Sequence, residues 1–326
     1  MLSIVWKRRK SVLTGVFLLF FFMGTAYAAF PDKPVTLVVG RGAGGSTDAI
    51  GRTFAPFLSK YLGVPVPVKN VKGAGGQIAN KMVYNTDPDG YTLIMGVFAS
   101  DVIQQLRKKP PYDFREFTCI HGIAGGDTNG LIVPYDSKIK SFEDILAASK
   151  KKRAGLTIAG VAIGSNSWLF AQLLKQEAGF KATYVPFDSG REATMSVVGG
   201  HVTGGAASSI NFPGLLKDKK IRVLGLASDK RLFYLPDTPT FSELGYPGVV
   251  FKTEQFLMGP PKIASDKIKI LESAAAKAVA DPEFLSLSKK QGFTVDSKSA
   301  DKTREELLKI FAYVKKILIG AGEKVD

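Results

Sequence analysis

The alternation of short apolar runs with segments of helical spacing constrains the fold of this chain most. In the first half, the expected strands are 35–39, 64–68 and 91–95, and the expected helices are 47–62 and 78–84. In the second half, the expected strands are 131–133, 157–159, 183–185 and 223–227, and the expected helices are 141–152, 168–178, 191–199, 265–280 and 301–318. Strand–helix alternation predicts an α/β protein with a mostly parallel sheet covered on both faces, here as two sheets.

The N-terminal segment has the three parts of a secretory signal peptide. Basic residues occupy 7–10, an apolar run covers about 12–23, and Ala26-Tyr27-Ala28 follows. This order predicts a signal peptide over residues 1–28, cleaved after Ala28. A membrane-spanning helix is the alternative, but it needs about 20 apolar residues and this run is shorter. We therefore expect an exported protein.

The cysteine and histidine content excludes several kinds of site. Cys119 is the single cysteine, so no internal disulfide can form. Its apolar neighbours indicate a buried, inert thiol rather than a nucleophile. The two histidines, His121 and His201, with one cysteine make a transition-metal site improbable, and no metal ligand is predicted.

The basic charge suggests an anionic partner but no nucleic acid. Cleavage after Ala28 would remove four basic residues and no acidic one, which lowers the formal charge from +15 to +11. Much of the remaining charge is scattered in short lysine runs, which form solvated faces or a field that attracts anions. Aromatic residues are not interleaved with it as in a nucleic-acid groove. We expect no nucleic-acid binding.

A Gly-rich loop joins the first expected strand to the first expected helix. It reads Gly-Arg-Gly-Ala-Gly-Gly-Ser-Thr-Asp over residues 40–48. Glycines allow the backbone N–H groups to turn inward, and the N-terminus of the following helix favours an anion. The loop therefore suits a carboxylate or a phosphate; a tight turn without a ligand is the alternative.

The same loop matches the dinucleotide fingerprint G-x-G-x-x-G at Gly40, Gly42 and Gly45. The second expected strand should then end in an acid that holds the ribose, but it ends in Val68-Lys69-Asn70. A lone match of this kind is weak evidence. No cofactor is expected.

Similar loops recur before other expected helices, at 72–77, 160–167 and 186–190. Loops of this composition from two lobes would face each other across a cleft. Their N–H groups and short hydroxyls can satisfy the oxygens of a carboxylate. Paired carboxylates and a Ser/His/Asp set do not accompany them, so we predict binding without a catalytic residue.

The ordered set of short motifs along the chain resembles one family, the extracytoplasmic solute receptors of tripartite tricarboxylate transporters, also called Bug or TctC-like proteins. The motifs are FPDKPVT at 30–36, AGGSTD at 43–48, GAGG at 73–76, DPDGYTL at 87–93, GSNS at 164–167, YVPF at 184–187, LPDTPT at 235–240 and ADPE at 280–283.

This resemblance implies a type II periplasmic-binding-protein fold, with two α/β lobes joined by crossing strands and a ligand cleft between them. Lobe 1 would take 30–130 and 255–326, and lobe 2 would take 131–254. The implied protein is a periplasmic monomer that delivers a small carboxylate to membrane permease subunits. The residues expected at the ligand are Arg41, Ala43, Gly44, Gly45, Ser46, Thr47, Asp48, Gly73, Ala74, Ser100, Gly164, Ser165, Asn166, Ser167, Asp188 and Ser189.

Three residues depart from the family pattern. Arg41 stands where an aromatic residue often lies against the ligand; it either clamps a more polar or doubly anionic ligand or points to solvent at the rim of the cleft. Asp188 stands where Lys or Gly is common, and could repel an anion or pair with an ammonium group. Phe256 replaces a usual Trp, which would reduce stacking without abolishing it.

Two other functions remain open at this stage. A receptor that signals to a partner would have the same sequence features as one that feeds a permease. An exported enzyme on this fold would need a nucleophile or base, which the sequence does not provide. The ligand also stays open among tricarboxylates, dicarboxylates, aromatic acids and acidic amino acids, because backbone donors recognise the carboxylate group alone.

Overall fold

The computed structural model describes residues 30–151, 155–250, 252–320 and 322–325. The predicted signal peptide, 1–28, lies outside these ranges. Residues 33–326 form one compact body, to which the following description applies. Within the described ranges, no helix combines the length and the apolar character needed to cross a bilayer.

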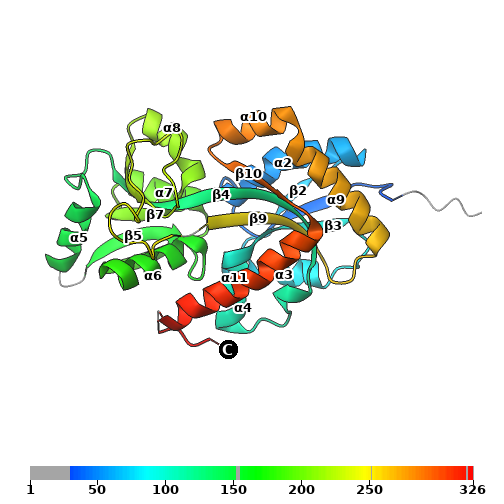
Figure 1. Cartoon of the computed structure of the whole chain (residues 1–326), viewed down its shortest axis with the longest axis horizontal. Helices are drawn as coiled ribbons and strands as arrows, with labels where there is room; N and C mark the ends of the chain where they lie inside the picture. Colours follow the sequence, from blue (N-terminus) through cyan, green and yellow to red (C-terminus); the bar gives the residue numbers. More distant parts are fainter. Residues whose placement is uncertain (1–29, 152–154, 251, 321, 326) are drawn as a thin grey trace, which may run out of the picture. The chain divides into compact units, whose positions relative to one another are not determined.

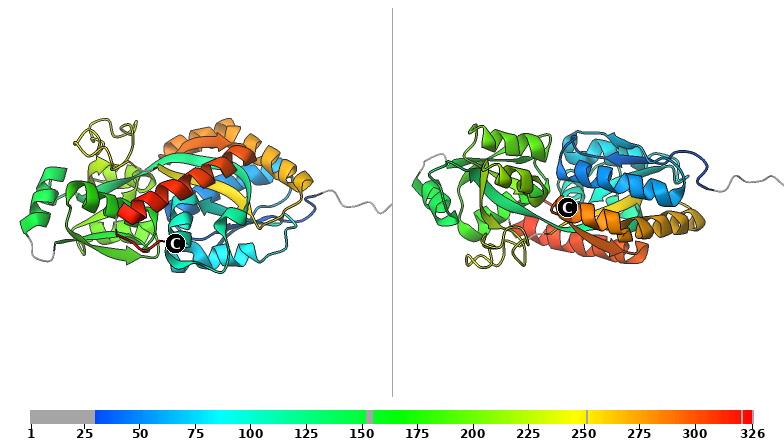
Figure 2. Two further views of the ribbon diagram at one scale, coloured as in Figure 1. Left: turned by 60° about the horizontal axis from the view of Figure 1, so that its bottom comes forward. Right: turned by 90° about the horizontal axis from the view of Figure 1, so that it is seen from above.

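The body has two α/β lobes, which Figures 1 and 2 show at opposite ends of the crossing strands β4 (Thr118–Pro134) and β9 (Lys252–Gly259). Lobe 1 contains β1 (Thr36–Val39), α2 (Ser46–Leu62), β2 (Val68–Asn70), η1 (Ala74–Gly76), α3 (Gln77–Tyr84), β3 (Thr92–Val97), α4 (Phe98–Lys108), η2 (Phe114–Glu116), α9 (Ser265–Ala280), α10 (Pro282–Lys290), β10 (Thr294–Lys298) and α11 (Ala300–Gly320). Lobe 2 contains α5 (Phe142–Lys151), β5 (Leu156–Val161), α6 (Asn166–Ala178), β6 (Ala182–Phe187), α7 (Gly190–Val198), β7 (Gly204–Ser208), η3 (Ser209–Asn211), α8 (Phe212–Lys217) and β8 (Ile221–Leu226).

Strand β4 belongs to the sheets of both lobes. The strand order is β2-β1-β3-β9-β4-β7-β5-β6, and β8 and β10 also pair with β4. The outer pairs β1–β2, β1–β3, β5–β6 and β5–β7 are parallel, whereas β4 is antiparallel to β7, β8, β9 and β10. The expectation of a mostly parallel sheet was therefore wrong, because β4 and β9 run in opposite directions between the lobes. The expected residue boundaries of the lobes stay a prediction.

The second expected strand, 64–68, is also shifted in the structure, where β2 covers Val68–Asn70. Pro65 and Pro67 accept hydrogen bonds from the N–H groups of Val35 and Leu37 at 3.0 and 2.9 Å. Proline has no N–H group to donate in return, so the segment lies along β1 but completes no ladder until Val68.

Sequence reasoning missed several elements that the structure contains. Helix α4 begins at Phe98 directly after β3 ends at Val97, with Gly96 as the one turn-forming residue nearby. Strand β7 reads GGAAS, and glycine and alanine are depleted in strands. Both elements are stabilised by their tertiary neighbours rather than by local propensity.

The core of lobe 1 is aromatic where α4 lies on the crossing strands. Phe98 and Phe256 are almost fully buried, and their rings stack with centroids 3.6 Å apart. Phe256 therefore stacks inside the protein instead of at a ligand. Helix α11 packs against α4 and β4. Cys119 is buried as expected, and burial raises the pKa of its thiol to about 11.

Removing the Phe256 ring should destabilise the protein strongly. Phe256→Ala leaves a cavity beside Phe98, and large-to-small changes of this kind cost about 3–5 kcal/mol. Urea denaturation followed by circular dichroism measures the loss. Phe233, which is 66% exposed and pairs with Tyr234, is the matched control. Phe233→Ala should cost at most about 1.5 kcal/mol, the value of an aromatic pair; equal losses would contradict the assignment.

Candidate functional site

A cavity of about 60 Å³ lies between the lobes, and residues of both lobes line it. The lining consists of Arg41, Gly45, Ser46, Thr47, Val97, Ser100, Asp127, Asn129, Val161, Ser165, Asn166, Ser167, Ser189, Gly190, Ala206, Ala207, Ser208 and Thr253. Nine of the residues expected from the sequence are among them: Arg41, Gly45, Ser46, Thr47, Ser100, Ser165, Asn166, Ser167 and Ser189.

Helices α2, α6 and α7 are among those that begin at this cavity, and they differ in how their first turns are capped. The Ser165 hydroxyl accepts from the Trp168 N–H group at the start of α6, and the Ser189 hydroxyl accepts from the Glu192 N–H group at the start of α7. Gly45 precedes α2 and provides no side-chain cap. The first N–H groups of α2 therefore lack a side-chain acceptor within the described structure. They lie beside the cavity at the positive end of the helix dipole, an arrangement that favours an anion.

Asp48, in the first turn of α2, holds the Gly-rich loop and does not line the cavity. Its carboxylate accepts from the Gly44 N–H group at 2.8 Å, from Asn70 at 2.8 Å and from Arg52 at 3.0 Å. Burial opposes ionisation of Asp48, but these hydrogen bonds outweigh it and lower its pKa. Asp48 thus fixes the loop so that Ser46 and Thr47 face the cavity. Ala43 and Gly44 are exposed and lie outside the lining.

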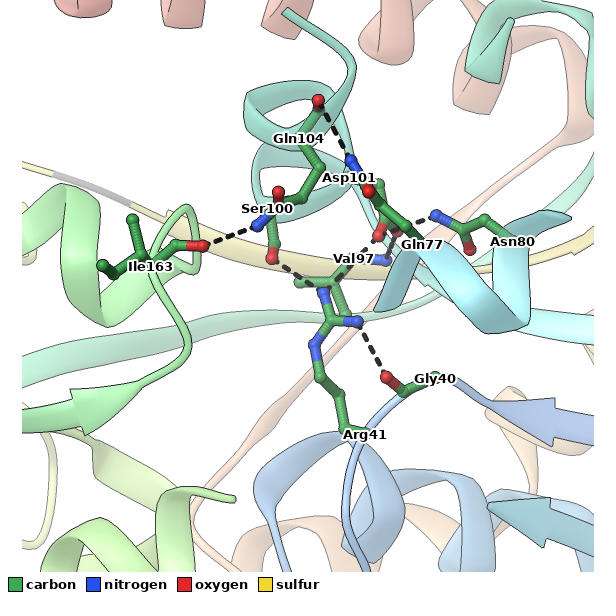
Figure 3. Close-up of polar contacts among 9 residues, drawn as sticks. All are labelled: Gly40, Arg41, Gln77, Asn80, Val97, Ser100, Asp101, Gln104 and Ile163. Atoms are coloured by element: carbon green, nitrogen blue, oxygen red, sulfur yellow. Dashed lines mark hydrogen bonds and ion pairs between the residues drawn. The ribbon is translucent and has the colours of Figure 1, made fainter. Parts of the chain in front are cut away.

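Arg41 reaches between Gly40 and the first turn of α4 (Figure 3). Its guanidinium donates to the Ser100 hydroxyl at 2.7 Å and to the Gly40 carbonyl at 3.0 Å, and lies 3.5 Å from Asp101. Its side chain is 12% exposed, so the alternative that it points to solvent was wrong. Gly76 leaves the space for this guanidinium, because a Cβ atom there would overlap it. A contact between Arg41 and the ligand stays a prediction.

Asp101 organises the residues around Arg41. Its carboxylate accepts from the Val97 N–H group at 2.8 Å and from Asn80 at 3.1 Å (Figure 3). Burial raises the pKa of Asp101, although the charge of Arg41 and these hydrogen bonds act in the opposite direction. The ion pair therefore fixes Arg41 at the wall of the cavity.

The loop before α6 forms a network of hydroxyl groups at the opposite wall. Ser165 and Ser167 lie 3.0 Å apart, and Ser167 is also 3.0 Å from the Tyr184 hydroxyl. Tyr184 donates to the Val161 carbonyl at 2.5 Å, while burial raises its pKa to about 12. The network keeps both serines at the cavity in fixed orientations.

Gly73, Ala74 and Asp188 line a neighbouring groove of about 260 Å³, which shares Arg41 and Val161 with the cavity. Asp188 pairs with Lys72 at 3.1 Å, and both side chains are more than 60% exposed. Gly164 lies outside the cavity lining, beside Gln104 of α4. These four predicted residues therefore do not line the cavity.

Direct contacts join the lobes around the cavity. The Gln104 side chain donates to the Ile163 carbonyl at 2.7 Å (Figure 3), and the Lys72–Asp188 pair also links the two lobes. A Cβ atom at Gly42 would lie 3.1 Å from that of Ser189, so the first Gly-rich loop approaches the start of α7 closely. Both loops can therefore contact one small ligand.

Sequence reasoning missed the residues that the crossing strands and β7 contribute, notably Asp127, Asn129, Ser208 and Thr253. Asp127 is 1% exposed and accepts from the hydroxyls of Ser208 at 2.8 Å and Ser209 at 2.9 Å. Burial raises its pKa to about 6 against these hydrogen bonds. The polar run Asp127-Thr128-Asn129 immediately before an apolar strand was the available signal. Within the described residues, no group of three His, Cys, Asp or Glu side chains is arranged to hold a metal ion.

Known proteins resemble this chain over most of its length. The model of a family described as tripartite tricarboxylate transporter family receptor matches residues 50–317. A UPF0065 protein in the gbd 5′ region of Cupriavidus necator is 33% identical over 259 residues, which cover 78% of this chain and 77% of that protein.

Solved structures agree with this fold. The periplasmic binding protein BugD has a TM-score of 0.86 at 24% identity, covering 90% of this chain and 99% of that one. An R. palustris protein with adipate has a TM-score of 0.85 at 25% identity, covering 90% and 98%. The type II periplasmic-binding-protein architecture is therefore shared with proteins of this kind.

Loss of the Arg41 side-chain charge should destabilise the protein. Arg41→Met leaves the buried Asp101 carboxylate without its cation, which costs on the order of 3 kcal/mol. Adding Asp101→Asn should recover part of this loss, as a double-mutant cycle in urea would measure. The exposed Lys72–Asp188 pair is the control, because Lys72→Met should cost less than about 1 kcal/mol. Strictly additive effects of the two changes would contradict a functional ion pair.

Asp127 and Asp48 should affect stability with opposite dependence on pH. The pKa of Asp127 is raised in the folded protein, so its contribution to the free energy of unfolding should fall by about 3 kcal/mol between pH 4 and pH 7. The pKa of Asp48 is lowered, so its contribution should be lost as the pH falls below about 4. Urea denaturation of wild type, Asp127→Asn and Asp48→Asn across this range measures both. The same slope for both variants would contradict the assignment.

Proposed function

Because this chain belongs to the tripartite tricarboxylate transporter receptor family, we propose that it captures a small carboxylate between its lobes and delivers it to the permease subunits of such a transporter. Its relatives include periplasmic binding proteins.

The uncapped N-terminus of α2 is the observation that carries the carboxylate assignment. Ser46 and Thr47 line the cavity at the positive end of this helix, and the starts of α6 and α7 lie on the same cavity. A carboxylate there would accept hydrogen bonds from backbone N–H groups and from the hydroxyls of Ser46 and Thr47. A bound anion would in this way supply the acceptor that Gly45 lacks.

A neighbouring structure supports the size and chemical class of the ligand. The R. palustris protein, 25% identical to this chain, was solved with adipate. Adipate is a linear six-carbon dicarboxylate, and we propose a ligand of comparable size for this cavity. Arg41, on the wall beside Ser100, would add a charge-assisted donor for one of its oxygens.

We place the working protein in the periplasm, exported by the predicted signal peptide and acting there as a monomer. The contacts between the lobes support a closed, ligand-holding arrangement that would open by a hinge at β4 and β9. The docking partner would be the membrane permease, which receives the ligand when the lobes separate.

Binding without turnover fits the residues at the cavity. Serine, threonine and asparagine side chains dominate its polar lining, while neither His121 nor His201 belongs to it. Burial lowers the pKa of His121, and the hydroxyl network before α6 contains no base beside its serines. We therefore expect captured ligands to be released chemically unchanged, as mass spectrometry of the incubated ligand would show.

A negative charge at the start of α2 should abolish carboxylate binding. Ser46→Glu places a carboxylate where the ligand would sit, and an acid in the first turn does not disfavour the helix. We expect the affinity for the best carboxylate of a C4–C6 panel to fall at least 10-fold, measured by isothermal titration and by the ligand-induced rise in Tm.

Ser265 provides the matched control, because it is the first residue of α9, is exposed and lies outside the cavity. Ser265→Glu should bind as wild type does. Unaltered binding by Ser46→Glu, or no binding of any carboxylate by wild type, would refute the proposed function.

A further inference from the structure

Asp127 is a buried acid in the wall of a cavity whose other features favour anions. It lies on β4 directly opposite Thr253 of β9, and both residues line the cavity. Its side chain is almost completely removed from solvent. An acid here would repel a ligand that carried negative charge alone, so its presence requires a reason.

The donors that hold Asp127 are neutral groups. Both carboxylate oxygens accept from the Ser208 hydroxyl, at 2.8 and 2.9 Å, and Oδ1 also accepts from the Ser209 hydroxyl at 2.9 Å. Among the described residues, none forms an ion pair with Asp127. Arg41 lines the same cavity, but its guanidinium is engaged by Ser100 and Asp101. Buried carboxylates are normally paired, so a cation is the missing partner.

Asn166 adds a second acceptor to the same part of the cavity. Its side chain is 91% buried, and its Nδ2 donates to the Thr253 hydroxyl at 3.1 Å. Its Oδ1 is buried without a hydrogen-bond partner. Thr253 stands opposite Asp127 in the ladder and accepts from Asn166, and all three residues line the cavity. A group that donates several hydrogen bonds would satisfy both Asn166 Oδ1 and the Asp127 carboxylate.

We propose that Asp127 and Asn166 form a subsite for a protonated amine, and that the ligand of this protein is an amino carboxylate. The carboxylate would lie at the start of α2, and the ammonium group would donate to Asp127 and to Asn166 Oδ1. The inference rests on the proposed function, since it assumes that a carboxylate enters this cavity. In this arrangement Asp127 pairs with the ammonium group, a role that the sequence suggested for Asp188.

A purely structural role for Asp127 makes a different prediction. The carboxylate also accepts from the backbone N–H groups of Ser209 and Ile210, at the start of η3. If this capping were its sole role, Asp127→Asn would lower the stability of the protein. It would change the affinities for ligands with and without an amine by the same factor. The ratio of the two affinities therefore separates the roles.

The test compares ligands that differ by the amino group alone: aspartate with succinate, glutamate with glutarate, and 2-aminoadipate with adipate. Isothermal titration at pH 7.5 should give, for at least one pair, an amino member that binds at least 10-fold tighter to wild type. In Asp127→Asn this ratio should fall to about one or below, through weaker binding of the amino member. Asn166→Ala should reduce the same ratio, and provides a second test should Asp127→Asn fold poorly.

Asp281 is the matched control, because it is a buried acid that caps α10 outside the cavity. Asp281→Asn should keep the wild-type ratio. If succinate, glutarate and adipate each bound as tightly as its amino partner, the inference would be overturned while the proposed function stayed intact. An unchanged ratio of the two affinities in Asp127→Asn would also overturn the inference and leave the proposed function intact. Failure of all six compounds to bind would overturn the proposed function, and the amine subsite with it.

Discussion

The antiparallel ladder between β4 and β9 is the interaction on which the rest of this structure depends. Strand β4 pairs with β9 and β10 in lobe 1 and with β7 and β8 in lobe 2, so one strand fixes the position of both sheets. The cavity lies where this strand passes between the lobes. Asp127 and Asn129 reach the cavity from β4, and Thr253 reaches it from β9. The strands that join the lobes therefore also contribute to the site.

The two walls of the cavity differ in chemistry because they come from different kinds of structure. Loops that lead into α2, α6 and α7 offer backbone N–H groups and hydroxyls, which suit an anion. The backbone N–H and C=O groups of the crossing strands are hydrogen-bonded within the ladder. The chemistry that these strands present to the cavity therefore comes from their side chains. Asp127 on β4 makes that side an acceptor region, to which the Asn166 oxygen at the start of α6 adds. A ligand with both charges would match the cavity better than a simple anion.

Two acids, Asp188 from the sequence prediction and Asp127 from the structure, behave differently for reasons of burial. Asp188 is 62% exposed and pairs with Lys72, so water screens its charge. Asp127 is 1% exposed and held by neutral donors, so water screens its charge little. Its electrostatic interaction with a charged group in the cavity is therefore strong. Arg41 follows the same principle, since Asp101 and Ser100 hold it at the wall.

The sequence by itself determined the α/β class, the family and the loops at 40–48 and 160–167, because strand–helix periodicity and glycine placement are local properties. It also identified half of the cavity, including Ser46, Thr47 and Ser165. Only the tertiary structure decided which strand joins the sheets, where the Arg41 guanidinium points and that Asp127 lines the cavity between the lobes. These depend on contacts between residues far apart in the chain: Asp127 meets Ser208 across 81 positions and Arg41 meets Ser100 across 59. A local sequence pattern does not predict contacts between residues that lie so far apart in the chain.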